Sequence, residues 1–190
     1  MIYAIGDSHI CFIAGLYHYQ VNPPYPAIYG NDKYKLIRKA KKITAYATSD
    51  TIEHIKNIIK EQNITDDDYI IFSYGEVDIR FYMSKYENTL HDAIKSYRDF
   101  LLAMPRQRIV FAPTVQLGSE TLDKFCVLFR EQLFEMCDSI GVPIIDLRKY
   151  ICCRLDGRPN SKYFDDDKIH LSFECRKFFE KELKDVMGGM

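Results

Sequence analysis

Short, continuous apolar runs alternate with amphipathic helical patterns along this sequence, and that alternation limits the folds open to it. The clearest run is Tyr69-Ile70-Ile71-Phe72-Ser73, which is typical of a central parallel strand buried on both faces. Weaker runs lie at residues 1–5, 42–47, 108–112 and 142–146. Helical spacing of apolar residues marks 10–17, 51–62, 86–104, 121–140 and 172–186. Strands separated by helices predict right-handed βαβ units and a three-layer α/β/α domain.

With this number of elements, we predict a flavodoxin-like sheet of five parallel strands in the order 2-1-3-4-5. Two segments between the first two strands have no regular pattern of their own. Residues 21–32 contain three prolines and a glycine, so we predict a loop there. Lys33 to Lys42 carries five lysines and one arginine, and we interpret it as a solvated face rather than a phosphate-binding patch.

Length and charge narrow the classes of protein. The 190 residues, of which 47% are hydrophobic and 28% charged, suit a single domain spanning 1–190. The net charge of −1 gives no overall field for nucleic acid or an anionic membrane. No apolar run reaches the ~18 residues of a membrane span, and the first residues lack a basic leader. We therefore expect a cytoplasmic protein with reduced thiols and no membrane or nucleic-acid partner.

A serine follows the first predicted strand directly. The stretch Ile5-Gly6-Asp7-Ser8-His9 joins that strand to the first helical pattern. Ligands of α/β domains bind outside the carboxyl ends of the strands, where helix N-termini point N–H groups outward, so Ser8 is the candidate nucleophile. The predicted switch point between strands one and three brings Ser8 beside the polar stretch from Gly75 to Arg80.

A nucleophilic serine needs a base, usually an imidazole that another group orients. His18, His54 and His91 fall on predicted helices or their ends and suit surface or core roles, and His9 is at most a pocket-lining residue. His170 differs, because Asp167 precedes it by three residues, within reach of its ring in one turn. Asp167 and His170 are therefore the candidate partners of Ser8, although a solvated acidic turn is the alternative.

In three blocks the sequence resembles the SGNH, or GDSL-like, hydrolase superfamily. These are Gly6-Asp7-Ser8, Gly75-Glu76-Val77-Asp78 and Asp167-Lys168-Ile169-His170, in the order that the family has them. The resemblance implies that Ser8 attacks an ester carbonyl, His170 transfers the proton and Asp167 positions the imidazole. It also implies an oxyanion site built from the backbone N–H of Ser8, a second-block glycine and a third-block asparagine.

The sequence departs from the family pattern at two of the three oxyanion donors. Val77 stands where the family has asparagine, and no glycine follows the second predicted strand. Residues 75–80, however, resemble a Gly-Glu-Ile-Asp-Cys-Arg variant found beside a Gly-Asp-Ser-His block. In that variant Arg80 is expected to hold the oxyanion or an anionic substrate group, with a salt bridge to Glu76 or Asp78 as the alternative.

The expected function is hydrolysis of a short acyl ester, such as an acetyl group on a carbohydrate or another small molecule. The predicted site consists of Ser8, Asp167 and His170, with Gly75, Glu76, Asp78, Arg80 and His9 around the substrate. Two alternatives remain: a catalytically attenuated carbohydrate-binding protein, because of Val77, and a glycan O-acyltransferase. No cofactor is implied, and the scattered cysteines form no metal set. Nothing in the sequence indicates an oligomeric state.

Overall fold

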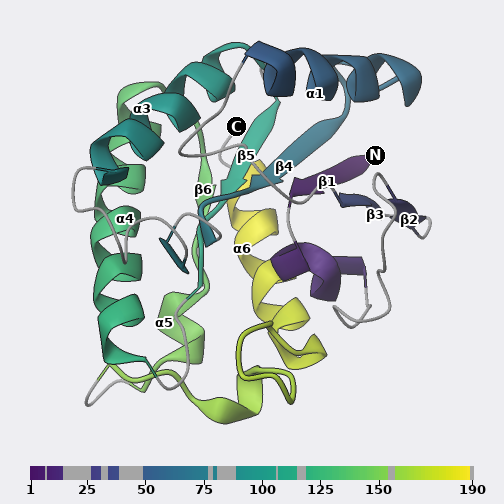
Figure 1. Cartoon of the computed structure of the whole chain (residues 1–190). Helices are drawn as coiled ribbons and strands as arrows, with labels where there is room; N and C mark the ends of the chain where they lie inside the picture. The colour runs from purple at the N-terminus through teal and green to yellow at the C-terminus, as the bar shows by residue number, and fades with distance from the viewer. Residues whose placement is uncertain are drawn as a thin grey trace.

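A six-stranded sheet forms the centre of the computed structural model (Figure 1). The structure describes residues 1–6, 8–14, 27–30, 34–38, 49–76, 79–80, 89–105, 107–114, 119–153 and 157–188. The strands are β1 Ile2–Gly6, β2 Ala27–Gly30, β3 Tyr34–Arg38, β4 Tyr69–Ser73, β5 Arg108–Phe111 and β6 Ile144–Ile145. Their order is β2-β3-β1-β4-β5-β6, with only β2 antiparallel to its neighbour. The predicted α/β class with a parallel sheet is confirmed.

Among the described residues the sheet has six strands instead of the predicted five, because β2 adds an antiparallel strand beside the five parallel ones. β2 lies within residues 21–32, where we predicted a loop, and it begins after Pro26, so no proline interrupts its hydrogen bonds. β3 lies in the lysine-rich segment that we interpreted as a solvated face, and it pairs in parallel with β1. Pairing across the sheet outweighs the charged composition there. The predicted strand at 42–47 lies outside the described residues.

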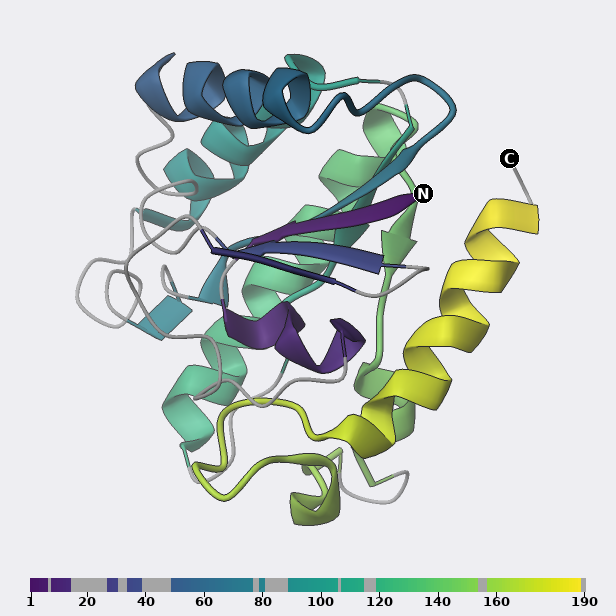
Figure 2. The same cartoon turned by 90° about the vertical axis from the view of Figure 1, so that its right-hand side faces the viewer.

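The helices cover both faces of the sheet (Figure 2). One face is covered by α1 Ser49–Glu61, α3 Thr89–Leu102 and α4 Glu120–Ser139, whose apolar side chains join Tyr3 and Phe72 in one core cluster. The 3-10 helix η1 Ser8–Ala14 and α6 Arg176–Gly188 cover the other face, around Ile71 and Phe111. Within the part of the chain that the structure describes, no helix is long and apolar enough to cross a membrane.

The long helices lie where apolar spacing predicted them, with ends that shift by a few residues. Ser119 caps α4 by accepting a hydrogen bond from the N–H of Leu122, and Gly141 follows the end of α4 with φ +64°. The described residues between β6 and α6 form three short helices: α5 Arg148–Ile151, η4 Ser161–Tyr163 and η5 Phe173–Cys175. The first helical pattern differs most, because it forms a 3-10 helix that begins at Ser8 itself.

Gly6 ends β1 where the sheet leaves no room for a side chain. It pairs with Ser73 of β4, and a Cβ on Gly6 would lie 2.4 Å from the Ser73 carbonyl oxygen. Because that neighbour is backbone, we expect Gly6→Ala to lower the free energy of unfolding by about 1–3 kcal/mol. Urea denaturation measures this, with Gly188→Ala as the control, since a Cβ there meets nothing within 4 Å. Equal stability of the two variants would contradict the tight β1–β4 contact.

Candidate active site

The ends of β1 and β4 lie side by side, as the predicted switch point requires. Gly6, the last residue of β1, is opposite Ser73, the last residue of β4. The chain after each strand then meets the other, because Nη2 of Arg80 lies 3.0 Å from Nε2 of His9. Segments about seventy residues apart in sequence therefore form one site at the carboxyl edge of the sheet.

The Asp-x-x-His segment forms a compact turn that holds the His170 ring. Oδ2 of Asp167 lies 2.5 Å from Nδ1 of His170, and Oδ1 accepts the backbone N–H of Ile169 (2.9 Å) and of His170 (3.0 Å). Lys168 has φ +60°, a left-handed conformation that reverses the chain between the two side chains. The N–H of Asp165 donates to the carbonyl of His170 at 2.8 Å, which closes the turn. The predicted contact between Asp167 and His170 is present.

Asp167 is ionised across the pH range in which enzymes usually work. Partial burial opposes its charge, but the hydrogen bonds from the His170 ring and from the N–H groups of His170 and Ile169 outweigh burial and lower its pKa to about 2. A carboxylate only accepts hydrogen bonds, so the proton between the two side chains belongs to Nδ1 of His170. The other ring nitrogen, Nε2, is then the basic one.

The N-terminal and C-terminal parts of the chain are in contact through two stacked imidazoles, those of His9 and His170. The rings of His9 and His170 lie 4.5 Å apart between centroids, with an angle of 25° between their planes. His9 is the residue after Ser8, and only 4% of it is exposed. The contact therefore places the Asp167–His170 pair beside the segment that carries the candidate nucleophile. The structure describes the backbone of Ser8, as the first residue of η1, but not its side chain.

Arg80 makes the ion pair that was the alternative interpretation of this residue. Its Nε lies 2.9 Å from Oε1 of Glu76, which is only 2% exposed. A turn closed by the hydrogen bond from the N–H of Ile79 to the carbonyl of Gly75 (3.0 Å) brings Arg80 back over Glu76. Gly75 has φ +113°, and a Cβ there would lie 2.7 Å from the Phe129 ring, so the turn needs glycine.

The remaining predicted residues lie partly beyond what the structure describes. Val77, Asp78 and His18 are outside the described residues, so the alternative partner Asp78 is not placed. His54 and His91 lie on α1 and α3, consistent with their predicted helices. The described part of the chain contains no group of three or more His, Cys, Asp and Glu residues arranged to hold a metal ion.

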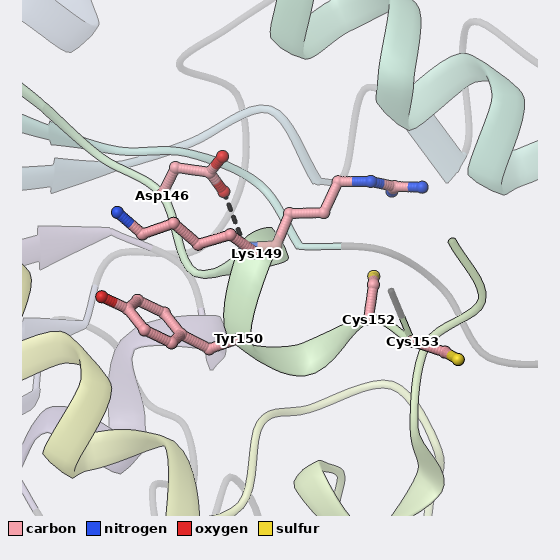
Figure 3. A pocket seen from close by; sticks show the side chains of 6 residues that line it. Asp146, Lys149, Tyr150, Cys152 and Cys153 are labelled. Carbon is pink, nitrogen blue, oxygen red and sulfur yellow. Dashed lines mark hydrogen bonds between the residues drawn. The ribbon is translucent and has the colours of Figure 1, made fainter. Parts of the chain in front are cut away.

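A separate hollow of about 890 Å³ lies beside α5 (Figure 3). In Figure 3 the side chains of Lys149 and Tyr150 extend to one side of α5, and Cys152 and Cys153 lie on the opposite side. Its charged groups are paired: Asp146 accepts the backbone N–H of Arg148 at 2.7 Å, and Lys149 lies 2.9 Å from Glu182. None of the predicted site residues lines this hollow.

Sequence reasoning missed the part that His9 plays. We expected it at most to line a pocket, yet its side chain contacts both Arg80 and His170. The only available signal was that a histidine in the first block occurs together with an arginine in the third. Neither residue shows by itself that the two side chains meet, because the contact depends on the pairing of β1 with β4.

No protein-family model matches the sequence, and no curated protein matches it significantly. Solved structures do resemble the fold. A GDSL-like lipase from Bacteroides thetaiotaomicron is 9% identical, with a TM-score of 0.62 over 100% of this chain and 88% of the other. A catalytic mutant of an acetylxylan esterase from Geobacillus stearothermophilus is 10% identical, with a TM-score of 0.56 over 98% and 93%. At such low identity these likenesses show the fold alone: this chain has the fold of GDSL-like hydrolases.

Proposed function

We propose that the protein is a serine esterase of the SGNH type that cleaves a short acyl ester through an acyl-enzyme on Ser8. Oγ of Ser8 attacks the ester carbonyl and gives its proton to Nε2 of His170. The tetrahedral intermediate expels the alcohol, which takes that proton. Water then attacks the acyl-enzyme with His170 again as base, and releases the carboxylic acid and free Ser8.

The observation that carries this proposal is the stacking of His9 on His170, at 4.5 Å between ring centroids. It joins the segment of the candidate nucleophile to a histidine whose Nδ1 is already held by a carboxylate, 2.5 Å away. That carboxylate fixes the tautomer in which Nε2 is the base, which is the role that a third triad member has in serine hydrolases. A solvated acidic turn, the alternative interpretation, would not require His170 to be 12% exposed and packed against a buried ring.

The structural neighbours support the same assignment. Mutants of the acetylxylan esterase that are described as catalytic replace a serine, an aspartate and a histidine, and the aspartate precedes the histidine by three positions. Asp167 and His170 have the same spacing. The name of the acetylxylan esterase states a substrate, and on that ground we propose an acetyl group on a carbohydrate.

For the oxyanion we propose the backbone N–H of Ser8, with Gly75 and Arg80 from the segment after β4. Arg80 is a permanent cation with five donors, and its contacts with His9 and Glu76 hold it at the edge of the sheet where Ser8 begins η1. Glu76 neutralises the guanidinium without reaching the substrate, because its side chain is 2% exposed. Asp78 completes the proposed substrate-binding set.

Labelling with a fluorophosphonate probe tests for an activated serine. We expect the probe to modify the protein once, and mass spectrometry of peptides to locate the label on Ser8. Hydrolysis of a chromogenic acetyl ester, measured with and without an added sugar whose hydroxyl groups can accept the acetyl group, then separates an esterase from an O-acyltransferase. Release of acetate at the same rate with and without the acceptor supports the esterase, whereas an acetylated sugar supports the transferase. A protein that binds acetylated sugars but neither reacts with the probe nor releases acetate would overturn the enzymatic proposal.

A further inference from the structure

The contact between Arg80 and His9 determines where the protons of His9 lie. A guanidinium has N–H donors and no acceptor, so Nε2 of His9, at 3.0 Å from Nη2 of Arg80, must be the acceptor. A nitrogen that accepts a hydrogen bond carries no proton. His9 is therefore the neutral imidazole with its one ring proton on Nδ1, and it stays so while Arg80 remains in place.

Without Arg80, the carboxylate of Glu76 would favour the protonated form of His9, with the proton coming from solvent. Oε1 of Glu76 lies 3.7 Å from Nε2 of His9, too far for a hydrogen bond but close enough for strong attraction between a carboxylate and an imidazolium. Both side chains are at most 5% exposed. Arg80 prevents this pairing, because it neutralises the carboxylate through Nε and occupies Nε2 of His9 through Nη2.

The state of His9 matters because its ring lies against His170, with 4.5 Å between centroids. In the proposed reaction His170 accepts the proton of Ser8 and becomes an imidazolium. A neutral ring presents a π face that stabilises such a cation, whereas a charged His9 would repel it in a site with little water. The reaction therefore benefits from a His9 that cannot be protonated.

We propose that Arg80, balanced by Glu76, locks His9 in its neutral form, so that His9 serves as an uncharged stacking platform for the imidazolium of His170. This inference rests on the proposed esterase function. It adds positioning roles for Arg80 and Glu76, which act on His170 through His9. Among the residues whose side chains the structure describes, the charged or titratable groups found against the two rings are Arg80, Glu76 and Asp167. Glu76 pairs with Arg80, and Asp167 pairs with His170 once His170 is protonated.

The tautomer of His9 is measurable in the wild-type protein without any substrate. Two-dimensional ¹⁵N–¹H spectra that correlate ring nitrogens with ring carbon-bound protons assign the proton on each histidine nitrogen. We expect His9 to show an unprotonated Nε2 and a protonated Nδ1 throughout the pH range in which His170 titrates. A proton on Nε2 of His9 in that range would overturn the proposal. Because the spectra need no turnover, this outcome is independent of whether the esterase function stands.

A pair of variants tests the effect of the lock on the reaction. In Arg80→Ala, Glu76 draws a proton onto His9, so we expect the plateau of kcat/KM to fall ~10-fold or more, by repulsion between charges a few ångströms apart. The acid limb of the profile should also move to lower pH, because protonation of His170 becomes harder. In the Arg80→Ala/His9→Phe double variant the ring at position 9 cannot be protonated, so the limb should return to the position that it has in His9→Phe alone.

The limb of the pH profile separates this role from the oxyanion role proposed for Arg80. Loss of an oxyanion donor lowers the plateau but leaves the acid limb in place, and His9→Phe would not reverse it. A limb that stays unshifted in Arg80→Ala therefore contradicts the lock. Arg176→Ala is the matched control, since Arg176 also pairs with a glutamate four residues away, Glu180, but on α6. If the wild-type protein has no esterase activity, the proposed function fails while the ¹⁵N spectra still decide the state of His9.

Discussion

Replacing Ser8 by alanine is expected to lower kcat for acetyl-ester hydrolysis by about 10⁴- to 10⁶-fold, because no other group can form the acyl-enzyme. The fold should survive, since Ser8 begins a short 3-10 helix whose packing residues, Ile10 to Ile13, remain unchanged. Ester turnover and fluorophosphonate labelling measure the effect. Ser139→Ala is the control, because Ser139 lies at the end of α4 and its hydroxyl donates to the carbonyl of Met136.

Combining this substitution with His170→Ala tests whether the two residues act as one unit. Loss of the nucleophile and loss of its base abolish the same step, so the double variant should be hardly slower than Ser8→Ala alone. Losses that multiply would mean that Ser8 and His170 act in separate steps, which contradicts the proposed mechanism. Residual turnover in Ser8→Ala close to the wild-type rate would eliminate Ser8 as nucleophile.

The central part of the fold was predictable because its signals are local. β4 is apolar on both faces, so burial on both sides follows from five consecutive residues. The amphipathic stripe of α4 and the glycine after it likewise appear in sequence within a few residues. β2 and β3 were missed because they form through pairing with other strands. β3 pairs in parallel with β1 despite its lysines, and β2 pairs with β3. Charge and proline counts describe the segment alone and carry no information about that partner.

The same difference between local signals and long-range contacts holds for the site. The contact between Asp167 and His170 spans three residues, so one turn of chain is sufficient to predict it. The stack of His9 on His170 spans nearly the whole chain, and sequence indicated only that both segments belong at the carboxyl edge of the sheet. For Arg80 the sequence left two interpretations, and the structure adds a third contact that neither contained, the one with His9. Side-chain partners that tertiary packing creates are the part that pattern reasoning does not reach.

Replacing Asp167 by asparagine is expected to lower kcat by about 10⁴-fold while the turn keeps its shape. The amide oxygen can still accept the N–H groups of Ile169 and His170, which hold the turn. Its NH₂ group, however, donates toward Nδ1 of His170, which moves the ring proton to Nε2 and removes the base. Kinetics on an acetyl ester measure the loss. The exposed neighbour Asp166 provides the matched control, and Asp166→Asn should stay within about threefold of wild type.

Stability against acid gives a second measurement on the same variant. The pKa of Asp167 is lowered from 3.8 in the unfolded chain to about 2 in the folded protein, so its charge stabilises the fold fully above pH 3.8. That contribution is lost as pH falls from 3.8 toward 2, where the folded carboxylate is protonated. Between these pH values the urea midpoint should therefore decrease more steeply for the wild type than for Asp167→Asn. Parallel decreases would mean that His170 does not hold the carboxylate, and the reason for assigning Nε2 as the base would be lost.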